Sequence, residues 1–339
     1  MDDISATTIQ TNHQDLVNDV TYDFYGRRMV SCSADQRVKV YDFNDDTETW
    51  AITSEWRAGD ASLMRVAWAH PSFGQVLAVC SLDRGVRIYE EQKKNFESKT
   101  WVEVAKLMDA RSAVLDISFC PFQHGCKLAA VSADATLRIY EAMEPGNLTY
   151  WTLMNEIALM PSPPSRNEQP AFCVNWCPSR WREQYIAVGC MNDAYIYKQN
   201  SHGKWKKVAE LPGHTDLIRD ICWAPSMGSS YYLIATACKD GNVRIFKVET
   251  LCEEVFQEEE DAGNSMTEDS NFNLNSLKVE LIGEYDNHKC QVWRCRFNVT
   301  GTILSSSGDD GCVRLWKASY ANLFKCISVV SLEKKPEKL

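Results

Sequence analysis

The chain of 339 residues is 45% hydrophobic and 11% aromatic, enough apolar material for one domain built from repeats. Nine acidic residues between 249 and 271 account for most of the net charge of −10 and leave −1 for the rest of the chain. This distribution argues against direct binding to nucleic acid, which requires a basic surface. No apolar run is long enough to span a bilayer, so we expect only indirect membrane contact.

The start of the chain, MDDISATTIQTNHQD, is polar and acidic, so we expect no secretory signal. The fourteen cysteines include no Cys-x-x-Cys pair, which favours reduced thiols and argues against a zinc site. The chain has no P-loop, no Gly-x-Ser-x-Gly and no His-Glu-x-x-His. We therefore expect no catalytic residue, no cofactor and no metal.

One short unit recurs along the chain: a strand, a turn that contains an aspartate, and a second strand that closes on an aromatic residue. The aspartate lies six residues before the aromatic in five copies, which are Asp35 and Tyr41, Asp83 and Tyr89, Asp134 and Tyr140, Asp240 and Phe246, and Asp310 and Trp316. A sixth copy, GCMNDAYIYK, ends on Tyr197 and has Met191 in place of the aspartate. This recurrence at one position per unit indicates a structural role for the aspartates rather than a catalytic ring.

The closing aromatics lie 48, 51, 57, 49 and 70 residues apart. Such a period, with about four short strands in each unit, predicts an all-β, six-bladed β-propeller that forms one domain over residues 1–339. The predicted blades span 13–59, 60–110, 111–160, 171–213, 214–285 and 286–332. The acidic stretch 249–276 is expected to be an insertion in blade five without fixed structure, and 333–339 a tail.

Three histidines precede their closing aromatics by 28 to 32 residues: His13, His214 and His288. We predict that these imidazoles hydrogen-bond the turn aspartates, as the Gly-His, Asp and Trp or Phe pattern of the WD-repeat family implies. The resemblance to that family extends from about His13 to Leu332. A basic residue recurs in five of the six third strands, where we expect it to face outward: Lys39, Arg87, Arg138, Arg244 and Arg314.

The last blade can be completed by its own chain, because FKCISVVSLE, starting at Phe324, resembles a fourth strand. This favours a ring left open between blades one and six, with SATTIQT near the N-terminus as the alternative, a sealing strand. An open ring would leave two apolar faces for an inserted partner segment. The residues predicted near the seam are Val20, Tyr22, Phe24, Val292, Trp293 and Phe297.

Longer segments resemble a particular group of WD-repeat proteins, the Seh nucleoporins: NWCPSRW, LPGHTDLIRDICWAPS and TGTILSSSGDDGCVRLWKASYANLFKCISVVS. The resemblance implies a non-enzymatic scaffold of the Y-shaped complex in the nuclear pore's outer ring, which supports mRNA export and protein import. It implies an α-solenoid nucleoporin that donates a blade in trans, and other Y-complex partners.

The same resemblance implies a second place at the cytoplasmic face of the vacuole or lysosome, in a coat-like complex that regulates TOR signalling. Two alternatives stay open from the sequence. One is the related propeller of the COPII vesicle coat, and the other is a WD-repeat substrate receptor of a ubiquitin ligase.

Overall fold

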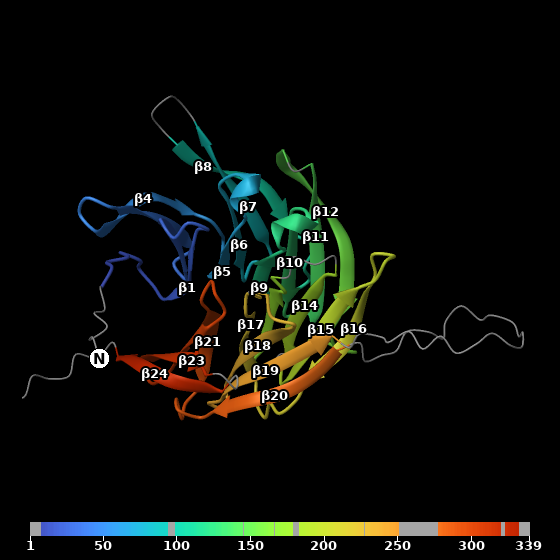
Figure 1. Ribbon diagram of the computed structural model, residues 1–339. Helices are drawn as coiled ribbons and strands as arrows, with labels where there is room; N and C mark the ends of the chain where they lie inside the picture. Colours follow the sequence, from blue (N-terminus) through green and yellow to red (C-terminus); the bar gives the residue numbers. More distant parts are fainter. Residues whose placement is uncertain are drawn as a thin grey trace, which may run out of the picture.

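The computed structural model describes residues 8–93, 99–144, 146–165, 167–178, 183–226, 228–250, 277–319 and 323–331. Six antiparallel sheets, each of four consecutive strands, are arranged around a central channel (Figure 1). This confirms the all-β, six-bladed propeller. Most of the predicted insertion (from 251 on) and the whole 333–339 tail lie outside the described residues.

The strands are numbered in chain order, and each predicted blade range contains the four strands of one sheet. Blade one contains β1 (Val17–Tyr22), β2 (Arg28–Ser33), β3 (Arg37–Asn44) and β4 (Thr49–Arg57). Blade two contains β5 (Leu63–Trp68), β6 (Val76–Ser81), β7 (Val86–Lys93) and β8 (Lys99–Leu107). Blade three contains β9 (Val114–Phe119), β10 (Lys127–Ser132), β11 (Thr136–Glu144) and β12 (Asn147–Ala158).

The remaining three blades follow the same order. Blade four contains β13 (Phe172–Trp176), β14 (Tyr185–Cys190), β15 (Asp193–Gln199) and β16 (Trp205–Leu211). Blade five contains β17 (Ile218–Trp223), β18 (Tyr231–Cys238), β19 (Val243–Thr250) and β20 (Leu277–Tyr285). Blade six contains β21 (Val292–Phe297), β22 (Ile303–Gly308), β23 (Cys312–Ala318) and β24 (Phe324–Ser331). The described residues contain no helix long and apolar enough to cross a membrane.

The hydrophobic core lies between neighbouring blades, because each sheet is apolar on both faces. In blades two to six, the closing aromatic packs against the blade that precedes it. Tyr89 shares a buried cluster with blade one, Phe246 with blade four and Trp316 with blade five. Each blade therefore presents an entry face to its predecessor and an exit face to its successor.

Blade one is fixed firmly to blade two by Arg28 on β2. Its guanidinium donates to Asp42 at 2.8 Å and to Glu91 of blade two at 2.8 Å. It also lies over the rings of Trp68 and Trp101, 5.7 and 5.6 Å from their centroids. A single arginine thus makes both charge-assisted hydrogen bonds and cation–π contacts between the two blades.

In the five blades whose turn between second and third strands has the aspartate, its carboxylate accepts a hydrogen bond from the backbone N–H two residues on. Examples are Asp83 with Gly85 at 3.0 Å and Asp240 with Asn242 at 2.9 Å. This side-chain cap explains why aspartate recurs there. The residue after the aspartate has a positive φ, which costs glycine little, as at Gly241 with φ of 90°.

The basic residues of the third strands do not face outward, contrary to the prediction. Arg87, Arg138 and Arg244 are buried and pair with the turn aspartates of their own blades at 2.6, 2.9 and 2.7 Å. Lys39 is also buried, and Arg314 contacts Asp310. A buried guanidinium needs a carboxylate partner, and the turn supplies it four residues earlier.

The histidines contact their turns in two blades. His13 Nδ1 lies 2.8 Å from Asp35, and His288 Nδ1 lies 3.0 Å from Asp310. In blade five the contact differs from the expectation, because His214 Nε2 bonds Thr236 Oγ1 at 2.9 Å. Asp240 accepts instead from Thr215 and Arg244.

Trp316 closes the hydrogen-bonded chain of blade six. Its Nε1 donates to Ser306 Oγ at 2.9 Å, and Ser306 Oγ also bonds His288 Nε2 at 2.8 Å. We expect Trp316→Phe to lower the free energy of unfolding by about 2–3 kcal/mol, because one buried hydrogen bond is lost and the smaller ring leaves part of the indole's space unfilled. Denaturant unfolding measures this. A loss no larger than that of Trp293→Phe, at a half-exposed site of the same blade, would contradict it.

Acid should weaken the fold through buried histidine. Burial, helped by the nearby Arg244, lowers the pKa of His214 to about 4. A pKa below the unfolded value of about 6.5 gives stability that is complete above pH 6.5 and lost as the pH falls towards 4. We expect this group to cost about 2–3 kcal/mol between pH 7 and 4.5. In denaturant unfolding across that range, His214→Gln should flatten the profile, whereas exposed His202→Gln should not.

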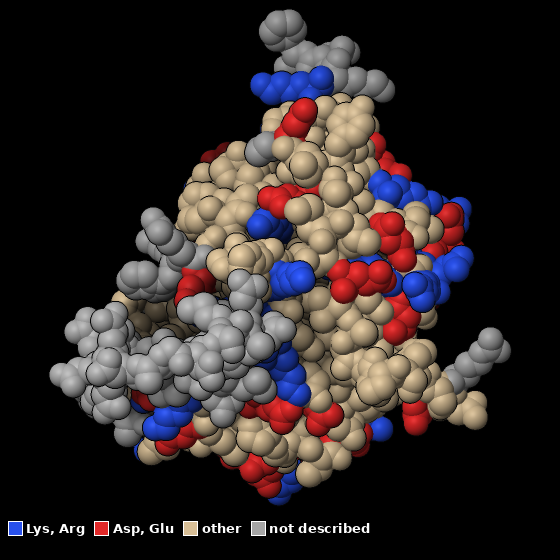
Figure 2. All heavy atoms as spheres, turned by 90° about the vertical axis from the view of Figure 1, so that its right-hand side faces the viewer, with Lys and Arg blue, Asp and Glu red and all other residues tan. Residues whose placement is uncertain are grey.

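Charged side chains of both signs are interspersed on the side of the ring that Figure 2 shows. Opposite charges alternate over short distances there, and the described residues visible on this side form no extended patch of one sign.

Candidate functional site: the junction of the first and last blades

A short pattern opens five of the six blades: an apolar residue, any residue, an aspartate or arginine, then another apolar residue or cysteine. A β-bulge falls in this pattern in each of the five first strands. Bulges turn a side chain away from regular alternation, here towards the central channel. The charges so placed are Asp19, Arg65, Asp116, Asp220 and Arg294. Blade four pairs regularly and has no charge there.

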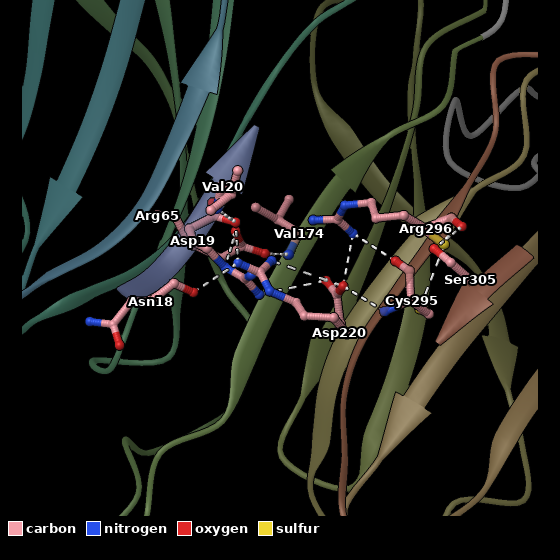
Figure 3. Close-up of polar contacts among 12 residues, drawn as sticks. Asn18, Asp19, Val20, Arg65, Val174, Asp220, Cys295, Arg296 and Ser305 are labelled. Carbon is pink, nitrogen blue, oxygen red and sulfur yellow. Dashed lines mark hydrogen bonds and ion pairs between the residues drawn. The ribbon is translucent and has the colours of Figure 1, made fainter. Parts of the chain in front are cut away.

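These five residues and Arg296 form the channel cluster, of which Figure 3 labels Asp19, Arg65, Asp220 and Arg296. Arg65 of blade two reaches Asp116 of blade three at 3.0 Å and Asp220 of blade five at 3.6 Å. Arg296 pairs with Asp220 at 2.8 Å. Three arginines balance three aspartates across the channel, which is how buried charge is tolerated.

The aspartates of the channel cluster also bond the next blade. Asp19 accepts from Val66 N at 3.1 Å, Asp116 from Val174 N at 2.9 Å, and Asp220 from Cys295 N at 3.1 Å. Burial raises the pKa of Asp116 to about 6, although Arg65 opposes the shift. Burial likewise raises the pKa of Asp19. These carboxylates thus fix how the first strand of one blade is positioned against the first strand of the next.

Blades one and six meet at the terminal junction, formed by the entry face of blade one and the exit face of blade six. Arg294 of β21 donates to Asp19 of β1 at 2.5 Å and to Asn18 O at 3.4 Å. These bonds join the two blades at the channel. In Figure 1 the chain's first and last blades adjoin near β1 and β21.

Outside these bonds and one corner near Thr11, the described residues leave the entry face of blade one exposed. In the other blades, the first strand packs against the preceding blade through three positions. Blade one has Val17, Val20 and Tyr22 at these positions, and these residues are 39, 45 and 52% exposed. At the first two positions blade two has Leu63 and Val66, only 0 and 4% exposed. The same sequence position is therefore buried in blade two and exposed in blade one, because blade one has no tightly packed predecessor.

The exit face of blade six is also uncovered. In blade five the corresponding face is fully buried against blade six, through Ala235, Ala237, Val243 and Ile245. The matching residues of blade six are all partly exposed and are Ser305, Ser307, Val313 and Leu315. Ile327 on β24 is 48% exposed. This face mixes small hydroxyl and branched apolar side chains.

The predicted seam residues divide between two sides. Val20 and Tyr22 lie on the entry face of blade one. Val292 and Phe297 differ from the prediction, because they pack in the cluster shared with blade five. Alternation sends successive strand residues to opposite faces, and a one-residue error reverses the side.

Two further seam predictions are placed elsewhere. Trp293 stacks on Arg219 of blade five at 4.7 Å and donates to Asp309 at 2.6 Å. Phe24 lies in the turn after β1, where its ring is 5.0 Å from that of His70 in blade two. Turn residues follow the nearest loop rather than the strand's face, which the sequence pattern did not reveal.

The segment proposed as an alternative sealing strand does not pair in its described part. Residues 8–11 form no strand, and β24 from the chain's own end completes blade six. Instead Thr11 O and Asn12 O accept from Tyr41 Oη at 3.5 Å and Lys39 Nζ at 2.8 Å. This part of the chain covers one corner of blade one's entry face.

Comparison with known proteins matches the model of the WD domain, G-beta repeat, at residues 5–42, 205–247 and 279–317. Nucleoporin SEH1 of Saccharomyces cerevisiae is 41% identical over 95% of this chain and 98% of its own length. The chain belongs to the nucleoporin SEH1 family. Nucleoporin SEH1 of Xenopus tropicalis is 39% identical over 98% of the chain and 89% of the relative. Nucleoporin SEH1 of Homo sapiens is 39% identical over 96% of this chain and 88% of its own length.

Membership of the nucleoporin SEH1 family makes the chain a non-enzymatic structural scaffold of the nuclear pore. It also decides between the three resemblances that the sequence left open, since these relatives are neither COPII coat propellers nor ligase receptors by name. The functional surfaces of such a scaffold are those that contact other proteins.

Proposed function

We propose that the terminal junction is the binding site of a partner segment that enters the ring as an additional blade. The donor is an α-solenoid nucleoporin of the Y-shaped complex, so the chain is a scaffold subunit of that complex in the nuclear pore's outer ring, which supports mRNA export and protein import. One observation carries the proposal. The positions of Val17 and Val20 are buried in the first strands of blades two, three, five and six but exposed on blade one.

Energetics favour a partner of this kind. A face of about 500 Å² corresponds to about 12 kcal/mol of unrealised burial as an upper bound, at about 25 cal/mol/Å². Soluble proteins seldom leave such a patch uncovered. Sheets stack about 10 Å apart, so a sheet-forming segment can fill the space between two blades.

The same junction serves, in this proposal, a second assembly at the cytoplasmic face of the vacuole or lysosome, the coat-like complex that regulates TOR signalling. Both assemblies would present the same kind of segment to the same two faces. A single chain can therefore belong to one complex or the other, and not to both at once through this site.

Purification of the tagged chain from its own cells, with mass spectrometry of the stoichiometric partners, tests the proposal. Solenoid nucleoporins, with or without subunits of the vacuolar complex, are the expected result. A structure of the purified complex should show the partner's strands between β1 and β23. A partner bound elsewhere, with the terminal junction empty, would overturn the proposed function.

A further inference from the structure

A cavity lined by both apolar and charged side chains lies at the inner end of the terminal junction. It has a volume of about 290 Å³ and is lined by Val17, Asn18, Asp19, Val20, Arg294 and Arg296. Two of these residues carry the apolar entry face, and two are arginines of the channel cluster. The cavity thus lies where the innermost strand of the proposed partner blade would reach the central channel.

The arginines of this cavity have unused donors. Arg294 Nη1 is buried without a hydrogen-bond partner and lies 4.0 Å from the nearest oxygen of Asp220. The side chain of Arg296 is 48% exposed, and Nη1 is the nitrogen that bonds Asp220 and Cys295 O. A buried guanidinium N–H without an acceptor is costly, so an incoming acceptor would be strongly favoured.

The ring itself shows which group meets such an arginine. Arg65 occupies in blade two the position that Arg294 occupies in blade six, and it pairs at 3.0 Å with Asp116 of the next blade. The element that follows blade six is the donated blade. In the free chain Asp19 of blade one bonds Arg294 in its place.

We infer that the innermost strand of the donated blade carries a carboxylate, an aspartate or glutamate, that enters this cavity and binds Arg294 and Arg296. This inference rests on the proposed function and adds the chemistry of the partner's inner end. Bidentate pairing of guanidinium with carboxylate supplies both strength and a fixed depth of insertion. The apolar faces then hold the blade, and the arginines set its register.

Two substitutions of one ion pair separate this role from a merely structural one. Arg294→Gln removes the receptor of the carboxylate, so the partner complex should bind about tenfold more weakly or worse. Asp19→Asn keeps an acceptor for Val66 N but removes the competing negative charge, so the same partner should bind severalfold more tightly. Both changes break the Asp19–Arg294 ion pair, so a structural role predicts weaker binding for both.

The measurement is the dissociation constant of each immobilised chain for the partner complex purified with the wild-type chain. Arg37→Gln, which removes an exposed charge paired with Glu55, is the matched control. Thermal unfolding checks each variant, and Arg296→Gln replaces Arg294→Gln if the latter does not fold. Weakening by both substitutions, or by neither, overturns the inference. Val20→Asp tests the junction separately: if it alone abolishes binding, the proposed function stands while the carboxylate falls.

Discussion

Val20→Asp should abolish recovery of the partner segment while the isolated chain remains folded. Val20 is 45% exposed in the free chain, so its replacement costs little stability there. In the complex, the change would remove about 1.5–3 kcal/mol of apolar burial and place a carboxylate in a dry interface. Together these exceed about 3 kcal/mol, which is more than a hundredfold in affinity. Co-purification and a binding isotherm with the wild-type partner measure the effect.

The chain offers two matched controls for this experiment. Val66 holds the same position in blade two and is buried, so Val66→Asp should unfold the chain rather than release a partner. Val299 lies in a blade-six turn and is 85% exposed, so Val299→Asp should change neither folding nor binding. Undiminished binding by a folded Val20→Asp variant would mean that the entry face of blade one does not contact the partner.

Arg65→Met should lower the free energy of unfolding by about 3–5 kcal/mol, because it leaves Asp116 and Asp220 without their shared cation. Without Arg65 to oppose burial, the already raised pKa of Asp116 should rise further. A raised carboxyl pKa gives stability at low pH that is lost as the pH rises through it. The variant should therefore be more strongly destabilised at pH 8 than near pH 5.

Denaturant unfolding of the wild type and Arg65→Met at the two pH values measures this effect. Arg57→Met is the control, because Arg57 is mostly exposed and lies 3.5 Å from Asp60 at the surface. A loss of stability that is the same at both pH values would show that Arg65 acts through packing, since removal of charge compensation has to depend on protonation.

The local features of the blades could be read from the sequence. Asp240 and Phe246 mark a hairpin whose turn is capped by a side chain two residues from its target, and such contacts depend on nearby residues alone. The apolar run of β18 likewise predicts a strand buried on both faces. Repetition of these signals predicted six blades without knowledge of how they meet.

The channel cluster had a signal that was not recognised. The pattern that places Asp19, Arg65 and Arg294 occurs five times, but its meaning depends on the bulge before each charge. Without the bulge, regular alternation assigns these residues to a blade face. Arg87 and its equivalents were expected to face outward, because the repeat pattern alone does not show that the turn aspartate four residues earlier pairs with the guanidinium.

By itself, the sequence determined the number of blades, their strand order and the chemistry of their turns, because these follow from periodicity and short-range hydrogen bonds. Only the tertiary structure decided that Val20 and Tyr22 face the terminal junction whereas Val292 and Phe297 face blade five. Both sides of these strands carry apolar residues, so composition cannot distinguish them. The side is set by bulge, register and neighbouring blade, and these exist only once the ring has formed.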